Sequence, residues 1–294
     1  MSYRFDLVAF LIWQTPGAAL LVWGLVLGVR PPGERSMAKW AARYGLTLTD
    51  ANRSLVARYR RRTRSLQLVG AGLGWLAIAL IVALTGLNIP LFGVSLLVTI
   101  AGYLLGAVIA ETTFLRPFGP PTGIRSASLV PRALPDYVPL FSVWALRVLP
   151  LVMIGLAVVY VLIPKLPLNP GDPNLGLVIG ITVFLVIFAI SVEQVLRMIV
   201  GRPQPVVDAG LVAADDAIRA SSIHALSGAS IGVLLVGIAG ALFWLGYATS
   251  AQSLSQPLSF LGTLAILLSL VSWIVLGHPS TWRVRHRAQL TSTP

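Results

Sequence analysis

Four charged residues lie within apolar stretches of the chain or end them, and their chemistry is that of an ion pair or a cation site. Glu111 and Glu193 each end an apolar run, and Arg147 lies inside another. Arg197 follows Glu193 by four residues, the favoured order for a pair on one helix face. The spacing predicts an intramembrane or interfacial ion pair among these four residues. Two facing carboxylates that bind a proton or a cation are the alternative.

Arg147 allows two interpretations of its own. A charge at the bilayer centre costs at least about 2.5–3.5 kcal/mol, so intramembrane arginines usually face a protein interior or a cavity. Counting back about 20 residues from Ile163 places Arg147 only one turn inside the membrane boundary, from where its side chain would also reach the cytoplasm by snorkelling. Because a neighbouring carboxylate compensates the charge directly, we predict that Arg147 lies inside the helix bundle and pairs with Glu111 or Glu193.

A run of basic residues precedes the second apolar segment and suits contact with anionic surfaces. It consists of Arg58, Arg60, Arg61, Arg62 and Arg64. A basic residue near an anionic membrane surface contributes about 1 kcal/mol of attraction. We expect these residues to contact the anionic headgroups of the lipid bilayer or a protein partner. Two helices joined by a short turn also occur in DNA-binding proteins, but anchoring by charge accounts for the run, and no nucleic acid is expected.

Two short patterns resemble parts of intramembrane proteases. The stretch Glu193-Gln194-Val195-Leu196-Arg197 resembles the Glu-Glu-x-x-x-Arg signature of the CAAX-type family, but Val192 stands where the first, catalytic Glu belongs. This departure excludes that family. Ser230 lies in a context similar to the rhomboid serine motif, and it would need His278 within hydrogen-bond reach. Small residues at this spacing also mark close helix packing, so an intramembrane hydrolase is kept only as a second alternative.

Metal and cofactor chemistry finds little support in the sequence. Asp208, Asp215 and Asp216 would suit a divalent cation, but acids before an apolar helix are also expected as caps and dipole partners. His224 is the one histidine in this region, and the chain has no Cys. No Gly-rich loop ends in Gly-Lys-Ser/Thr, the pattern that cradles phosphates. We therefore expect neither a metal nor a cofactor.

The composition indicates lipid rather than water as the main solvent of the chain. Of its 294 residues, 56% are hydrophobic and 11% are charged, with a net charge of +12. Soluble domains carry about 25% charged residues. An α-helix needs about 20 apolar residues to cross the roughly 30 Å core of a bilayer. Seven stretches satisfy this length: Leu7–Val29, Leu66–Leu87, Pro90–Ala110, Val138–Ile163, Leu175–Val200, Ile223–Tyr247 and Pro257–Gly277.

The placement of Lys and Arg predicts the orientation of this all-α integral membrane protein. Most of the 22 basic residues lie in the first, third and fifth loops and in the tail, which would share one face of the membrane. Cytoplasmic loops carry the excess of Lys and Arg. About seven transmembrane helices then place the N-terminus outside and the C-terminus in the cytoplasm. Few Lys beside many Ala, Gly and Arg is typical of a high-GC bacterial genome, so we expect a multi-pass protein of the bacterial plasma (inner) membrane.

The chain is treated as a single polytopic membrane domain, residues 1–294, with a basic helical cytoplasmic loop at residues 30–65. Pro31 and Pro32 end the first helix, and Glu34–Tyr44 is predicted to be a short helix stopped by Gly45 at a C′ position. The stretch Thr47–Asp50 has the spacing of a capping box, which predicts a second helix that runs directly into the membrane.

A shift of 82 residues aligns Glu111 with Glu193 and Gly119 with Gly201. It predicts a tandem repeat of helical hairpins, with residues 90–163 equivalent to residues 175–247. Parallel repeats occur in transporters, but they also occur in proteins that transport nothing.

No signature in the sequence names an activity. We favour a non-catalytic accessory or scaffold component of the membrane over an enzyme. A small secondary transporter or permease subunit that uses Glu111, Glu193 and Arg147 is the first alternative, and an intramembrane hydrolase is the second.

Overall fold

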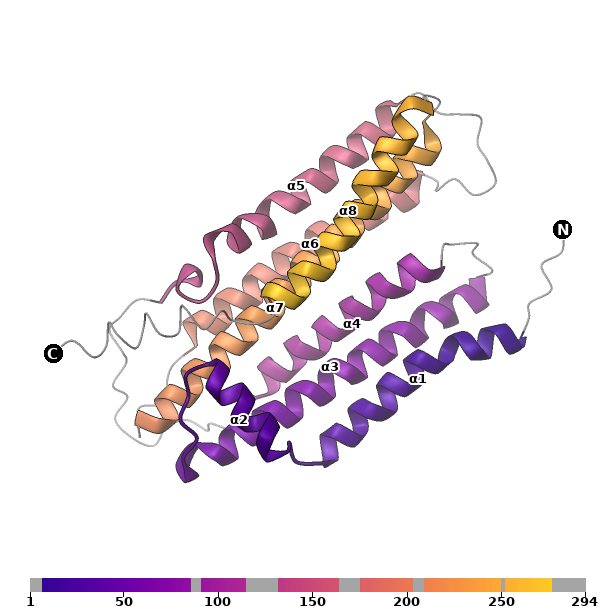
Figure 1. The fold of residues 1–294 in the computed structure, drawn as a ribbon. Helices are drawn as coiled ribbons and strands as arrows, with labels where there is room; N and C mark the ends of the chain where they lie inside the picture. Colours follow the sequence, from indigo (N-terminus) through magenta and orange to yellow (C-terminus); the bar gives the residue numbers. More distant parts are fainter. Residues whose placement is uncertain are drawn as a thin grey trace. The chain divides into compact units, whose positions relative to one another are not determined.

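All regular elements in the part of the chain that the structure describes are helices, as expected of an all-α protein (Figure 1). The computed structural model describes residues 7–85, 91–114, 132–163, 175–202, 209–249 and 252–276. The helices are α1 (Leu7–Val29), α2 (Glu34–Arg43), α3 (Asp50–Thr85), α4 (Leu91–Phe114), α5 (Leu140–Leu162), α6 (Leu175–Gly201), α7 (Ala209–Ala248) and α8 (Gln252–Leu276). A helix therefore overlaps each of the seven predicted apolar segments.

The structure forms two compact units, and the single polytopic membrane domain stays a prediction. The first unit takes in Met1–Glu34 and Ser54–Gly119, and thus contains α1, α4 and most of α3. The second takes in Arg35–Arg53 and Pro120–Pro294, and thus contains nearly all of α2 together with α5 to α8. Helix α3 belongs to both, because its residues up to Arg53 lie in the second unit.

Four helices of the second unit are long and apolar enough to cross a membrane. They are α5, α6, α7 from Gly210 and α8 from Ser253. Shorter apolar helical stretches, Gln14–Val29 and Val98–Glu111, lie in the first unit. By length and composition, four described helices can thus cross a membrane, and the count of seven stays a prediction.

Glycines bring the helices of the first unit close together. Gly70 and Gly74 of α3 face Gly102 and Gly106 of α4, and each pair is four residues apart. A methyl group on any of these glycines would overlap the backbone of the opposite helix. Small residues at this spacing allow the close backbone approach that packs helices in membranes. Helix α1 approaches α3 equally closely at another glycine. A Cβ on Gly24 of α1 would lie 2.8 Å from the backbone N of Val69.

Helix α7 is the centre of the second unit. In the most apolar stretch of α7, 83% of the residues are buried. In the corresponding stretches of α5, α6 and α8, 22–28% of the residues are buried. All three of these helices pack against it. Helix α8 runs antiparallel to α7, as shown by contacts of Gly246 with Ser255, Gly232 with Ser269 and His224 with Leu276. A helix that is apolar all round and enclosed by others is expected at the core of a bundle.

The outward faces of the surrounding helices are apolar. Leu151 of α5, Ile187 of α6 and Phe260 of α8 are 64%, 58% and 69% exposed, and many similar residues flank them. Soluble monomers rarely expose contiguous apolar patches beyond a few hundred Å². Lipid is the solvent that suits such a surface.

The basic loop after α1 is ordered in the way its sequence predicts. Helix α2 ends at Arg43, and Gly45 follows with φ of 63°, the left-handed conformation that favours glycine. Helix α3 then runs without interruption from Asp50 to Thr85. Its cap is shifted from the predicted one: Thr49 is the capping residue, and the Asn52 side chain accepts a hydrogen bond from the Thr49 N–H at 2.9 Å.

This loop is attached to α7 by packing and by hydrogen bonds. Met37, Trp40 and Ala41 form the buried face of α2. The Trp40 indole N–H donates to Ser221 Oγ at 3.3 Å, and Asn52 Nδ2 donates to the Gly210 carbonyl at 3.4 Å. Asn52 also donates to the Thr47 carbonyl at 3.0 Å, which holds the turn before α3. Residues 35–53 of this loop are therefore a folded part of the second unit.

The two halves of the predicted repeat differ in secondary structure just before α5. Residues 132–139 contain a 3₁₀ turn at Leu134–Asp136 and non-helical backbone, whereas the equivalent residues 214–221 lie inside α7. Pro135 and Pro139 explain the difference, because proline lacks the N–H that a helix interior needs. Moreover, α4 and α5 belong to different units. The superposition of the two hairpins stays a prediction.

Candidate functional site

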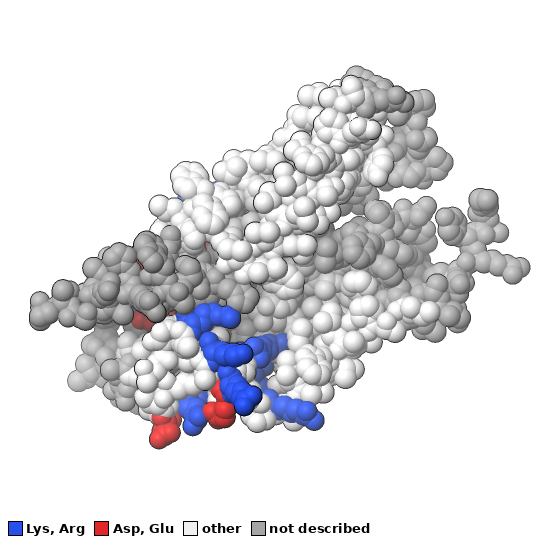
Figure 2. Space-filling model, in the orientation of Figure 1, with Lys and Arg blue, Asp and Glu red and all other residues white. Residues whose placement is uncertain are grey.

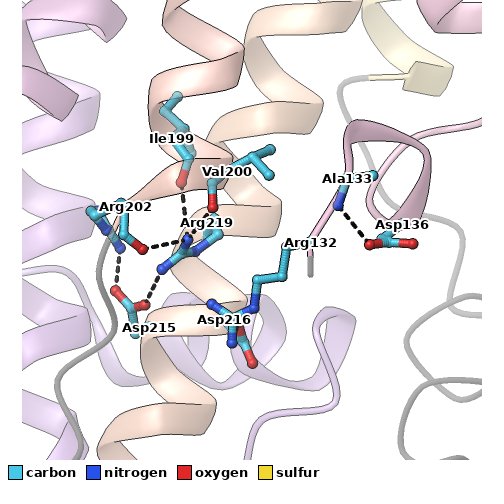
Figure 3. Close-up of polar contacts among 9 residues, drawn as sticks. All are labelled: Arg132, Ala133, Asp136, Ile199, Val200, Arg202, Asp215, Asp216 and Arg219. Carbon is cyan, nitrogen blue, oxygen red and sulfur yellow. Dashed lines mark hydrogen bonds and ion pairs between the residues drawn. The ribbon is translucent and has the colours of Figure 1, made fainter. Parts of the chain in front are cut away.

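A buried charge network joins the end of α6 to α7 (Figure 3). Arg219 of α7 is fully buried, and its Nη2 donates to Asp215 Oδ2 at 2.8 Å, one turn earlier on the same helix. The other Asp215 oxygen accepts from Arg202, which follows the last residue of α6. The exposed fractions of the Arg202 and Asp215 side chains are 8% and 6%. Two guanidinium groups thus share one carboxylate away from solvent.

Arg219 also caps the C-terminal end of α6. Its Nη1 donates to the carbonyls of Ile199, Val200 and Arg202 at 3.1, 2.7 and 3.0 Å. The last four carbonyls of a helix have no partner within the helix, and the dipole gives that end a partial negative charge. The Arg219 guanidinium group donates hydrogen bonds to unpaired carbonyls and brings positive charge to the negative end of the helix dipole. The excess positive charge of the network is therefore balanced by the helix end, and the arrangement is that of a structural lock.

The acidic residues of this region were misassigned from the sequence. Asp215 and Asp216 were expected as caps before an apolar helix, but α7 already begins at Ala209, so both lie beyond its first turn. Asp216 pairs with Arg132 at 3.3 Å. Asp208 lies outside the described residues. The signal that was overlooked is Asp215 followed four residues later by Arg219, the same spacing that was recognised for Glu193 and Arg197.

A second cluster lies on the outer surface where α5 and α6 meet. Arg147 Nη2 and Arg197 Nη2 each donate to Glu193 Oε1 at 2.7 Å. The side chains of Arg147, Arg197 and Glu193 are 47%, 58% and 22% exposed. The structure therefore brings together three of the four residues predicted for an ion pair, with Glu193 as the shared acceptor.

The expected enclosure of Arg147 is not observed. Arg147 is exposed and lies on α5 beside the exposed Trp144 and Val148. The bundle interior therefore does not surround it. The physical reason is geometric: apolar side chains of α7 fill the centre of the second unit, and Arg147 lies beside the buried face of α5, which Leu146 and Met153 occupy. The pairing with Glu193 occurs at the surface.

Glu111, the fourth predicted residue, lies in the first unit. It is on α4, three residues before the helix ends, and it is 3% exposed. The predicted repeat makes Glu111 equivalent to Glu193, but the two differ in burial, because the Glu193 side chain is 22% exposed.

The basic residues at the start of α3 differ in exposure. Arg58, Arg62 and Arg64 are exposed and Arg61 is half-buried, but Arg60 is buried at 6%. Arg60 therefore does not offer its side chain to lipid or a partner as expected, because it lies on the face of α3 that is packed. Figure 2 shows Lys and Arg gathered around α2 and the beginning of α3. The exposed members of this surface include Arg35, Lys39, Arg43 and Arg53.

The residues considered for hydrolysis and metal binding are not assembled for either. Ser230 is fully buried, and its hydroxyl oxygen has no hydrogen-bond partner among the described residues. His278 lies outside the described residues. His224 Nδ1 lies 3.1 Å from the Leu276 carbonyl, at the packed boundary of α7 and α8. Within the described ranges, no group of three His, Cys, Asp or Glu side chains is arranged to hold a metal ion.

Comparison with known proteins gives no relative from which a role could be transferred. No protein-family model, curated protein or solved structure matches the chain. The geometry of the two arginine clusters and of the basic surface therefore carries the functional argument.

Proposed function

We propose that this chain is a non-catalytic accessory or scaffold component of a bacterial plasma membrane, with seven transmembrane helices, the N-terminus outside and the C-terminus in the cytoplasm. The observation that carries the proposal is the folded basic surface formed by α2 and the start of α3. Its buried face packs on α7, while Arg35, Lys39 and Arg43 are exposed on α2 at a spacing of four residues. A rigid, charged platform at one membrane face suits a protein partner that carries acidic groups.

The state of the carboxylates supports this role over transport. A transporter that works through Glu193 would need the carboxylate to exchange a proton or a cation. Glu193 is instead held by Arg147 and Arg197, each at 2.7 Å. Asp215 is likewise held by Arg202 and Arg219. In both clusters the cations outnumber the carboxylates, which disfavours binding of a further cation.

Single-cysteine labelling tests the orientation, because the chain has no cysteine of its own. Cysteines at Ser253 and at Asn169 should react with a membrane-impermeant maleimide in intact cells. A cysteine at Ser126 should react only after permeabilisation. Reaction of the Ser126 variant in intact cells would show that the proposed orientation is wrong.

Copurification tests the accessory role. A stoichiometric protein should remain bound to the wild-type chain when it is purified from native membranes in mild detergent. Reversing the charge of Arg35, Lys39 and Arg43 together to Glu should release it, because these side chains present the platform. The matched control reverses Arg147 to Glu, outside the platform, and should retain the partner. A wild-type chain that purifies alone would contradict the proposal.

A further inference from the structure

The cluster of Arg147, Glu193 and Arg197 has unused hydrogen-bonding capacity. A guanidinium group carries five N–H donors. Among the described residues, Arg147 and Arg197 each make one hydrogen bond, and both go to the same oxygen of Glu193. The cluster keeps a net charge of +1. In contrast to Arg219, neither arginine donates to a backbone carbonyl of a described residue.

The surroundings of the cluster are apolar and exposed. On α5, Phe141 and Trp144 are 59% and 62% exposed; on α6, Ile190 and Met198 are 57% and 56% exposed. These residues lie within about two turns of the arginines. Arg147 and Arg197, with N–H groups not bonded to described residues, are thus surrounded by an apolar surface that suits acyl chains.

The position of the cluster along α5 and α6 allows its side chains to extend toward the level of the lipid phosphates. Arg147 near the start of α5 contacts Glu193 near the end of α6, so these two helix ends lie on the same side. Arg147 is about 10 Å from the start of α5, and Arg197 is about 6 Å from the end of α6, at 1.5 Å per residue. The interfacial zone adds about 5–7 Å on each side of the hydrocarbon core, and long basic side chains extend toward it.

We propose that Arg147 and Arg197 bind the phosphate of an anionic phospholipid in the leaflet next to the start of α5, which is cytoplasmic in the proposed topology. The inference rests on the membrane placement of α5 and α6 given above. Arginine recognises phosphate through paired N–H donors. Glu193 orients both guanidinium groups and limits their charge to +1. Phe141 and Trp144 provide an apolar surface for an acyl chain, which a free phosphate ion would not use.

Lipid retention by the purified full-length protein tests this site. Native mass spectrometry would count lipids retained from detergent micelles that contain phosphatidylglycerol or phosphatidylcholine. The wild type should retain one phosphatidylglycerol in preference to phosphatidylcholine. The double variant Arg147→Gln/Arg197→Gln should weaken this retention at least about tenfold, the loss expected when charge-assisted hydrogen bonds are removed. The matched control Arg30→Gln, at an exposed position just after the end of α1, should leave it unchanged.

A second variant separates a lipid site from a loss of folding. Glu193→Gln removes the competing carboxylate and raises the cluster charge to +2, so phosphatidylglycerol should be retained more strongly. A merely structural cluster would give the opposite result or none. Equal retention by the wild type and the double variant, equal retention of both lipids, or full displacement by excess inorganic phosphate would each overturn the proposal. The assay in micelles does not depend on orientation, so the cysteine labelling can fail independently.

Discussion

The two arginine clusters have the same composition and different surroundings. Each contains two guanidinium groups and one carboxylate, and each involves the C-terminal part of α6. Arg219 is fully buried and its excess charge is compensated by three carbonyls at the end of α6. Arg147 and Arg197 are about half exposed, and in the part of the chain that the structure describes Glu193 is their one hydrogen-bond partner. The comparison shows that burial and backbone partners, rather than residue type, separate a structural lock from a surface that can take a ligand.

Removing the buried cation should have the largest effect. Arg219→Met leaves the carbonyls of Ile199 and Val200 without their donor and Asp215 with Arg202 alone. Loss of one partner from a buried ion pair typically costs about 3–5 kcal/mol. We expect a strongly lowered melting temperature in detergent, measured by fluorescence-detected size-exclusion chromatography. Arg62→Met, at an exposed position of α3, is the control, and equal melting of the two variants would remove the distinction between the clusters.

Neutralising the buried carboxylate should have an intermediate effect. Asp215→Asn leaves two cations together, but Arg219 keeps the three backbone carbonyls that accept from its Nη1. We expect a loss of about 1–3 kcal/mol, the range for a buried polar group that loses its partner. Adding Arg202→Met should recover part of this loss in a double-mutant cycle of thermal unfolding. A purely additive cycle would mean that Arg202 and Asp215 do not interact.

Removing a cation from the exposed cluster should have the smallest effect. Arg147→Gln leaves Glu193 paired with Arg197, and the side chain it replaces is 47% exposed. Exposed ion pairs contribute about 0–1 kcal/mol. We expect a melting temperature close to that of the wild type in lipid-free detergent. If Arg147→Gln destabilised the chain as much as Arg219→Met, the exposed cluster would be a structural element as well.

Features that depend on neighbouring residues were predictable from the sequence. The end of α2 follows from Gly45, and the uninterrupted α3 follows from the lack of a breaker after Asp50. The contact between Glu193 and Arg197 follows from their spacing of four residues on one helix. Each of these features is decided within one or two helical turns, where propensity and spacing act directly.

Features that depend on packing were predicted less well. Whether Arg147 faces a bundle interior or the outside depends on which helix is central, and hydropathy alone does not distinguish α7 from α5 or α6. Arg60 was expected at an exposed surface because its neighbours are basic, but the face of α3 that it occupies is packed. The glycine spacing of Gly70 and Gly74 was available as a signal for close helix contact. The length and hydropathy of an apolar stretch do not show which face of its helix is packed.

The course of α3 has a mechanical consequence. Its first turn, Asp50–Arg53, belongs to the unit built around α7, and its remaining turns belong to the unit packed through glycines. Asn52, in that first turn, holds the Gly210 carbonyl of α7. A helix resists bending unless its backbone hydrogen bonds are disturbed. At Arg53–Ser54 the chain therefore passes from one unit to the other within a continuous helix, where a sharp bend would disturb backbone hydrogen bonds.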